Sequence, residues 1–465
     1  MNVTEQLNDL MKALEAGSYN AAPSTLSQGA SLQVEDLSPV MENVTWSDQH
    51  IKLQKALSKK EARSTLVQFN RQLDYGVFGG SAQYEGGIGE EDTSNYVRAV
   101  VPMAYYSTIR RVSVAANMIG AFDGRKAEDR AADDAAKKIT GDIEFDSFRG
   151  QADYSNAGVF DGNPAAQAEM PGMRGVDAQI RESDSLANTQ DLMFAEYGSD
   201  QTVVVSVNGT MTQSTIEDMA VKSAMQHGSA DKLLMDPISL SAYNKIAHAK
   251  ERIMLAGSAQ EASGANLRQQ WTSSAMVSLE PSRFLSGKTR PARARAGSPA
   301  APAAPTVTSP ADAASNLPAG DYWYKVTAAN ERGESTETAA AAATTIAAGQ
   351  RGNVSIPAVS GAKYFNVYRS EDGGTAASAK FIGRVKASGS GATEFRDLGN
   401  RTPGSVTAYL IQSDTMGFHE LSGYSRLKLA VSDLSLPEAH FSFLCLAAYQ
   451  PRKNVLGENV EGQLS

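Results

Sequence analysis

The 465-residue chain has a single cysteine and no long apolar run. Its single cysteine, Cys445, excludes an intrachain disulfide. The apolar surroundings of that cysteine, FSFLCLAAY, predict a small buried side chain rather than a nucleophile. No apolar run approaches the ~20 residues of a membrane-spanning helix, and the first residues lack the basic and apolar regions of a signal peptide. These absences predict a protein that is made and kept in a cytoplasm.

The sequence also lacks the motifs that indicate catalysis or metal binding. The stretch SRFLSGKT ends like a phosphate-binding loop, but Ser282 stands where that motif needs glycine. No G-x-S-x-G sequence is present. The histidines do not pair at metal-ligand spacing; they are His50, His227, His248, His419 and His440. We therefore expect no enzyme, no cofactor and no metal.

Positive charge is scarce as well. The chain has 43 Lys and Arg against 52 Asp and Glu, a formal net charge of −9. A general nucleic-acid binder needs a basic face, so this balance argues against that role. It is compatible with a protein that lies beside packed DNA without binding it, because like charges repel.

The N-terminal third predicts an arm, a long hairpin and a long helix. Residues 4–16 have the pattern of an amphipathic helix that is too short to be stable alone. Its apolar face consists of Leu7, Leu10, Met11 and Leu14. Residues 18–45, rich in Ser, Ala, Pro and Asn, predict an extended arm. Beyond them, β-rich flanks enclose a loop whose glycines favour a mobile or tightly turned tip. These glycines include Gly79, Gly80, Gly86 and Gly87.

Residues 123–148 predict a charged helix with a narrow packing stripe, although Gly141 weakens the expectation for its last turns. The stripe repeats every four residues, at Ala127, Ala131, Ala135, Ile139 and Ile143. Further on, strand and helix patterns alternate. A strand is expected at 202–207, and Ser214 with Glu217 predicts a capping box for the next helix. A second strand and helix are expected on either side of Asp236-Pro237, which together indicate α/β or α+β structure.

Composition then changes to a Pro/Ala linker with a basic start, which we interpret as a solvated tether rather than a phosphate-binding segment. Its basic residues are Lys288, Arg290, Arg293 and Arg295. The stretches GDYWYKVTAANERGES and YFNVYRS follow, and they alternate as short strands do. The strand aromatics are Tyr322, Trp323, Tyr324, Tyr364, Phe365 and Tyr368. This pattern resembles fibronectin type III or immunoglobulin-like modules. For Trp323, a core or strand-face position is favoured over a ligand-stacking platform.

The order of elements resembles the major capsid protein of tailed bacteriophages, the Hong Kong 97 type of fold. FNRQLDYGVFGGSAQYEGG and YYSTIRRVSVAANMIG are similar to that family's E-loop and its return. KAEDRAADDAAKKITGDIEFDSFRG resembles the spine helix of its peripheral P-domain. LLMDPISLSAYNK resembles part of its axial A-domain, and FSFLCLAAYQPRKNVLGENV its closing strands.

The resemblance implies an α+β capsid fold with an inserted all-β, immunoglobulin-like sandwich. The implied domains are an N-terminal arm at 1–60, the E-loop hairpin and return strand at 61–122, the spine helix and P-domain at 123–185, the A-domain at 186–296, the linker and insertion at 297–403, and C-terminal strands at 404–465 that complete the A- and P-domains.

The implied function is structural. Copies of the chain would assemble as hexamers and pentamers into an icosahedral head shell, built in the host cytoplasm, with the E-loop tip between subunits. Portal and scaffold proteins are the implied partners, with cement proteins as an option. Packaged DNA would lie nearby without sequence-specific contact. The inserted domain would be an external decoration, with weak host-surface or glycan contact left open.

One departure from the family concerns lysine. The family's type member forms Lys–Asn cross-links through an E-loop lysine, but residues 64–109 contain no lysine. We therefore expect no such cross-link here. Alternative interpretations are a tail tube or sheath protein, a bacterial compartment shell of the same fold, and a surface adhesin or carbohydrate-binding protein. The long charged helix after a glycine-tipped hairpin favours the capsid.

Overall fold

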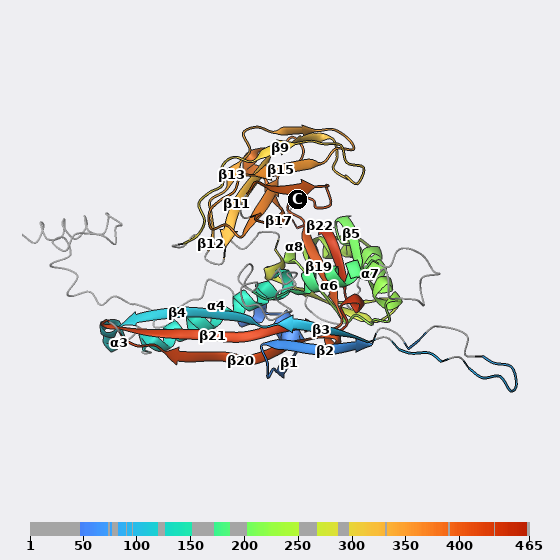
Figure 1. Cartoon of the computed structure of the whole chain (residues 1–465), viewed down its shortest axis with the longest axis horizontal. Helices are drawn as coiled ribbons and strands as arrows, with labels where there is room; N and C mark the ends of the chain where they lie inside the picture. Colours follow the sequence, from blue (N-terminus) through green and yellow to red (C-terminus); the bar gives the residue numbers. More distant parts are fainter. Residues whose placement is uncertain are drawn as a thin grey trace, which may run out of the picture.

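The computed structural model describes residues 47–72, 75–76, 82–89, 91–94, 96–119, 126–150, 172–186, 202–250, 267–286, 297–330, 333–388, 391–431 and 433–462. They form an elongated sheet, a compact six-stranded sheet near the end of it from which β2 and β3 project, and an all-β unit above the compact part (Figure 1). The α+β class is confirmed. The expected helix at 4–16, the arm at 18–45, Gly79, Gly80 and the basic linker residues lie outside the described residues.

The long sheet has the order β1-β20-β21-β4. Its strands are β1 (Ser58–Glu61), β20 (Met416–Lys428), β21 (Ser435–Ala448) and β4 (Ala104–Ser113). Strand β21 pairs antiparallel with both β20 and β4. It is apolar on both faces at its C-terminal end, as expected of a strand inside a sheet. The edge strand β1 runs parallel to β20, and all four of its residues are exposed.

One face of this sheet is covered by α4 (Ala127–Arg149). The predicted stripe turns inward at Ala135, Ile139 and Ile143, which are all buried. Gly141 does not interrupt the helix, because this glycine is itself buried. Burial of Phe148, about two turns further on, stabilises the last turns, so packing outweighs the low helix propensity of glycine.

A buried carboxylate fixes the N-terminal part of the described chain to α4. Glu144 has no exposed surface, and its two oxygens accept hydrogen bonds from the backbone N–H groups of Lys52, Leu53 and Gln54, at 2.9, 2.7 and 3.1 Å. These groups open the short helix α2 (Leu53–Ala56), which follows η1 (Asp48–His50). Burial raises the pKa of Glu144, while the three donors act in the opposite direction.

Ion pairs hold the other end of α4 to the sheet. The Arg426 guanidinium contacts Glu128 and Glu438, both at 2.6 Å, and Lys428 lies 2.8 Å from Glu128. The hydrogen bond from Lys428, followed by the other charges of the cluster, lowers the pKa of Glu128 to about 2. The helix is therefore tied to strand β20 by charge and to α2 by a single carboxylate.

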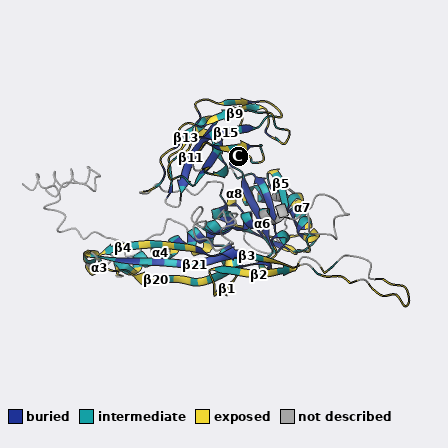
Figure 2. Cartoon of the chain, viewed as in Figure 1, coloured by how far each residue is buried: buried dark blue, intermediate teal, exposed yellow. Residues whose placement is uncertain are grey.

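The compact part is built on a six-stranded sheet, β5-β22-β19-β6-β8-β7. The strands are β5 (Val204–Gly209), β22 (Val455–Val460), β19 (Val406–Ile411), β6 (Lys232–Met235), β8 (Met276–Pro281) and β7 (Gln269–Trp271). The helices are α6 (Val176–Leu186), α7 (Gln213–Met225) and α8 (Pro237–Lys250), with short turns η4 (Arg283–Leu285), η6 (Ser413–Thr415) and η7 (Pro451–Lys453). One hydrophobic core runs from this sheet to α4 and the long sheet (Figure 2).

Two local predictions are corrected. The cap of α7 is Thr212, whose hydroxyl accepts from the Thr215 N–H, so the Ser214–Glu217 capping box was wrong. Glu217 instead accepts from the N–H of Ser273. The return strand of the hairpin was expected to stay β-rich to its end, but α3 (Val114–Ile119) is helical. The Ser113 hydroxyl accepts from the Ala116 N–H there, which opens the helix.

The all-β unit holds two main sheets around its own core. One contains β11 (Tyr324–Asn330), β12 (Gly333–Glu334), β13 (Thr338–Ala339), β16 (Tyr364–Arg369) and β17 (Lys380–Lys386). The other contains β9 (Thr306–Thr308), β15 (Gly352–Ile356) and β18 (Thr393–Asp397), and β10 (Gly320–Tyr322) pairs with β14 (Thr344–Ile346). A short turn, η5 (Ala376–Ser378), precedes β17. The unit therefore interrupts the chain between β8 and β19 of the compact sheet.

We predict that Glu144→Ala lowers the free energy of unfolding by about 3 kcal/mol, because three buried N–H groups lose their acceptor. Urea unfolding of the dispersed chain measures this. Asp134→Ala, an exposed carboxylate on the same helix, is the control and should change stability by less than about 0.5 kcal/mol. Equal effects of the two substitutions would contradict the role assigned to Glu144.

We also predict an acid-dependent loss of stability from Glu128. Its pKa is about 2 in the folded chain against an ordinary 4.5, so its contribution is complete above pH 4.5 and is lost as the pH falls towards 2. Glu128→Gln should flatten the dependence of unfolding free energy on pH in this window, and Asp134→Asn should not. An unchanged slope in Glu128→Gln would refute the assignment.

Candidate intersubunit surfaces and the junction of the inserted unit

The hairpin of β2 (Leu66–Gln72) and β3 (Tyr96–Pro102) is anchored firmly at its base. The Arg71 guanidinium donates to the carbonyls of Ala448 and Tyr449, at 2.7 and 2.8 Å, at the end of β21. A small apolar cluster lies under the base, and its buried members are Ala62, Val101, Met103, Cys445 and Ala447. The direction in which the loop leaves the molecule is therefore set by β21.

The tip of this loop exposes apolar side chains far from the rest of the chain (Figure 1). Tyr84 is 96% exposed and Ile88 is 92% exposed. Between them, the Gly87 N–H donates to the Tyr84 carbonyl, and Gly86 has a φ of +83°. That turn needs a positive φ at its third residue, so glycine is required at 86. Of the glycines predicted for the tip, Gly86 and Gly87 are therefore part of a defined turn.

The loop is also acidic. Residues 72–97 contain no Lys or Arg. Their acidic residues are Asp74, Glu85, Glu90, Glu91 and Asp92. A projecting loop with exposed aromatic and aliphatic groups and one sign of charge has the chemistry of a contact with another molecule.

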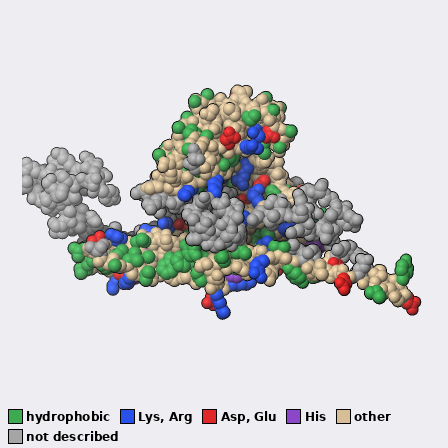
Figure 3. Space-filling view, in the orientation of Figure 1, with side chains coloured by type: hydrophobic (Ala, Val, Ile, Leu, Met, Phe, Trp, Pro, Cys, Tyr) green, Lys and Arg blue, Asp and Glu red, His purple; other side chains and the backbone are tan. Residues whose placement is uncertain are grey.

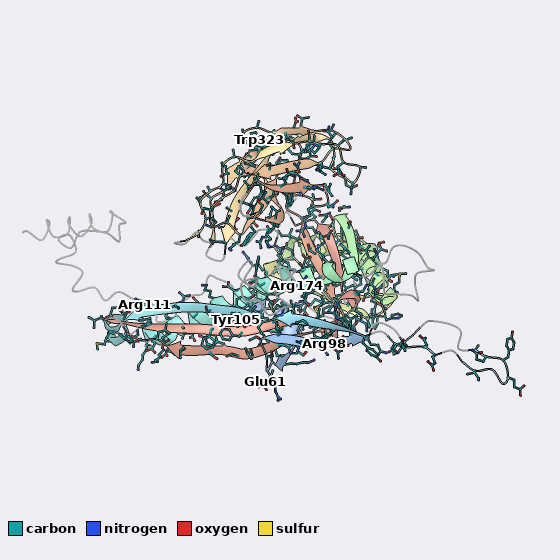
Figure 4. The ribbon with its side chains drawn as sticks, viewed as in Figure 1. Glu61, Arg98, Tyr105, Arg111, Arg174 and Trp323 are labelled. Atoms are coloured by element: carbon teal, nitrogen blue, oxygen red, sulfur yellow. The ribbon has the colours of Figure 1, made fainter. Side chains whose placement is uncertain are left out.

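The long sheet has a second uncovered surface, on the face opposite α4. We call it the open strip, and it consists of Tyr105, Ile109, Leu427, Phe441 and Phe443. Tyr105 and Phe443 meet edge to face at 5.1 Å, and Phe441 stacks on Phe443 at 5.0 Å. Hydrophobic side chains gather along this sheet in Figure 3, and Tyr105 and Arg111 lie along it in Figure 4.

The exit of the all-β unit is fixed to the compact sheet by Asn459. Its Nδ2 donates to the Asn400 carbonyl at 2.7 Å, and its Oδ1 accepts from the Thr402 N–H at 3.1 Å and from the Ser405 hydroxyl at 3.3 Å. Asn459 has a φ of +56° at an irregularity in β22, which is tolerated better by asparagine than by most residues. This junction is a bonded contact rather than a free tether.

Inside the unit a buried ion pair continues from that junction. Arg369 and Asp397 are 2.5 Å apart and almost fully buried, and the Tyr324 hydroxyl donates to Asp397 at 2.9 Å. Arg369 also donates to the Arg401 carbonyl at 2.8 Å. Burial raises the pKa of the Tyr324 hydroxyl, so it stays a donor. The core of the unit is thereby linked to the segment held by Asn459.

The strand aromatics of the unit divide into core and surface residues. Tyr322, Tyr324 and Phe365 are buried in its core. Tyr364 and Tyr368 are half-buried on the outer face of the sheet, where Tyr364 stacks under the Arg384 guanidinium at 4.2 Å. Trp323 is also half-buried and lies in the part of the unit that is far from the long sheet (Figure 4).

The described residues contain no cluster of His, Cys, Asp and Glu that could hold a metal ion. None of the described helices is long and apolar enough to cross a membrane. Cys445 is buried, as its apolar surroundings predict, and burial raises the pKa of its thiol to about 12. A thiol in this state is a poor nucleophile.

Comparison with known proteins gives distant similarities. No family model matches the chain. The chain is 22% identical to the major capsid protein of Staphylococcus phage K over 280 residues, which cover 60% of this chain and 54% of that protein. It thus spans about half the length of the curated relatives it matches. Among solved structures, the capsid of the native GTA particle aligns with a TM-score of 0.46 and 11% identity, covering 96% and 100% of the two chains. The capsid of phage XM1 aligns with a TM-score of 0.44 and 8% identity, again covering 96% and 100% of the two chains.

We predict that Asn459→Gly releases the inserted unit while leaving both sheets folded, because glycine keeps the positive φ and removes the bonded side chain. Hydrogen exchange at the Thr402 N–H should accelerate at least tenfold. Asn208→Gly, which loses only one bond to Asn459, is the control and should leave this exchange largely unchanged. Unaltered exchange in Asn459→Gly would contradict the assigned role.

Proposed function

We propose that the chain is the major capsid protein of a tailed bacteriophage and builds an icosahedral head shell. The observation that carries the proposal is the projecting loop between β2 and β3. Tyr84 and Ile88 are almost completely exposed there, and leaving such groups in water is unfavourable. Contact with a second copy would bury them. The curated relative named a major capsid protein supports the same assignment.

The architecture supports a shell subunit in a second way. Among the described residues, the order hairpin, long helix, compact α/β part and closing strands is the order that the resemblance implies. Strands β20 and β21 return to the long sheet, and β19 and β22 to the compact sheet, so the C-terminal residues join both parts. We propose that copies associate as hexamers and pentamers in the host cytoplasm, without catalysis.

The all-β unit is proposed to be an immunoglobulin-like decoration on the outside of the particle. Its bonded junction would hold each copy in a fixed orientation. The outer face carrying Tyr364, Tyr368 and Arg384 is where we would expect weak host-surface or glycan contact. Portal, scaffold and optional cement proteins remain the proposed partners, and packaged DNA would lie nearby without specific contact.

We predict that the purified full chain forms closed shells or ring-shaped capsomers in negative-stain electron microscopy. Removal of residues 297–403 should preserve assembly and remove surface knobs. The double variant Tyr84→Ser with Ile88→Ser should raise the concentration needed for assembly at least tenfold, because the buried contact is lost. Ala82→Ser, an exposed position in the same loop, should not.

Tubes in place of shells would favour a tail protein. Chains that remain monomeric would count against a shell protein and would favour the adhesin interpretation. Normal assembly of the double variant would show that the loop tip is not an intersubunit contact, even where the chain does form shells.

A further inference from the structure

His440 of β21 is a buried histidine with one ring nitrogen left unbonded. Its side chain has no exposed surface and lies where α4 runs over the long sheet (Figure 1). Its Nδ1 lies 2.9 Å from the hydroxyl of Tyr424 on β20, and the two rings stack with their centroids 6.0 Å apart. Its Nε2 forms no hydrogen bond with any described residue and lies 3.9 Å from Oε2 of Glu438. Buried polar atoms are rarely left without a hydrogen bond, so Nε2 calls for an explanation.

The hydrogen bonds of Tyr424 decide which ring nitrogen carries the hydrogen. The Tyr424 hydroxyl donates to the Ala132 carbonyl of α4 at 3.0 Å. A hydroxyl has one hydrogen, and a carbonyl can only accept. We therefore assign the hydrogen of His440 to Nδ1, which donates to the Tyr424 oxygen, and Nε2 is a bare acceptor. The carboxylate oxygen of Glu438 is also only an acceptor, so it cannot bond to Nε2 while the ring is neutral.

The carboxylate that faces Nε2 belongs to the attachment of α4. Arg426 donates from Nε to Oε2 of Glu438 at 2.6 Å, and from Nη2 to Oε1 at 2.9 Å. The same Nη2 contacts Glu128 in the first turn of α4 at 2.6 Å. Tyr424 and Arg426, the side chains of β20 beside the ring and its facing carboxylate, therefore both bind α4 as well.

We propose that His440 is a proton-sensitive latch that holds the first turns of α4 on β20 while its ring is neutral. A proton taken up from solvent at Nε2 makes the ring a donor aimed at Oε2 of Glu438, the atom that Arg426 Nε already binds. Two cations then share one carboxylate and repel each other. The Arg426 side chain is 31% exposed and His440 is fully buried, so Arg426 is the one that moves outward, and α4 is released there. The latch does not depend on the shell function proposed above.

The surrounding charges offer the imidazolium no free partner. Those near the ring or its bonded neighbours are the carboxylates of Glu438, Glu128, Asp129 and Asp133 and the cations of Arg426, Lys428, Arg110 and Lys138. The two signs are equal in number. Uptake of a proton therefore leaves one positive charge in excess in a buried place, which is unfavourable.

The same surroundings set the pH range of the latch. Burial lowers the pKa of His440 below its ordinary 6.5; Glu438 acts in the opposite direction, and Arg426 and Arg110 add to the effect of burial. The stability that depends on the neutral ring is therefore complete above pH 6.5 and is lost as the pH falls through the lower pKa of the folded chain. This range begins above that of Glu128, whose contribution is complete above pH 4.5.

Hydrogen exchange in the dispersed full chain tests the latch. Protection of the backbone N–H groups of residues 131–134 in α4, corrected for intrinsic exchange, should fall at least fivefold between pH 7.5 and pH 5.0. His440→Asn keeps a donor for the Tyr424 oxygen and cannot take up a proton, so its protection should change less than twofold. The matched control is His419→Asn, because His419 is half-buried in the same sheet and bonds to Tyr449; it should behave like the unmodified chain. An equal fall in His440→Asn and the unmodified chain would overturn the proposal.

A second measurement needs no substitution of histidine. In nitrogen NMR of the chain labelled at histidine, the His440 signals are those that shift in Tyr424→Phe. At pH 7.5 they should show a protonated Nδ1 and a bare Nε2, and the protonated fraction of Nε2 should grow as the pH falls to 5.0. A bare Nδ1 at pH 7.5, or no proton uptake by the ring down to pH 5.0, would refute the latch even where His440→Asn fails to fold. Both readouts use dispersed chains, so a failure to form shells does not affect them.

Discussion

Strand β21 needs apolar cover on both of its faces, and the arrangement of the other elements follows from that need. The helix α4 covers one face, and the base of the β2–β3 hairpin covers the end of the other. Arg71 joins the hairpin to the last carbonyls of the strand. The hairpin therefore covers this end of β21 and is oriented by it. Where neither element reaches, Phe441 and Phe443 remain partly exposed. A thin plate of one sheet and one helix cannot bury all of its apolar surface alone, which is the physical reason to expect association.

The two ends of α4 are held by different kinds of interaction. At the N-terminal end, Glu128 is a carboxylate kept charged by Lys428 and Arg426 near the surface. Near the C-terminal end, Glu144 is buried, and hydrogen bonds from the backbone N–H groups of Lys52, Leu53 and Gln54 offset part of its lost hydration. The first attachment weakens in acid, whereas protonation of the second relieves a buried charge. A fall in pH from 4.5 towards 2 would therefore loosen the helix from one end only.

The sequence allowed prediction of those features that depend on local periodicity. The stripe Ala135–Ile139–Ile143 and the alternation that buries Tyr322 and Tyr324 were both readable, because neighbouring residues in the pattern meet the same core. The prediction of Ser214 as the helix cap was wrong because Thr212, two residues earlier, offers the same side-chain hydroxyl as an acceptor. Arg71 and Asn459 were missed as site residues. Their partners lie 377 residues and 57 residues away in the chain, and no spacing rule connects such positions.

The missed junction at Asn459 changes what the inserted unit can do. A Pro/Ala tether alone would let the unit sample many orientations. Hydrogen bonds run instead from Asn459 to the exit segment, and from Arg401 through Arg369 to Asp397 in the core of the unit. Each copy in a proposed shell would then present the same face at the same angle. Weak contacts made by many fixed copies reinforce one another, because after the first contact the others become intramolecular. Rigid attachment therefore suits a weakly binding decoration better than a flexible tether does.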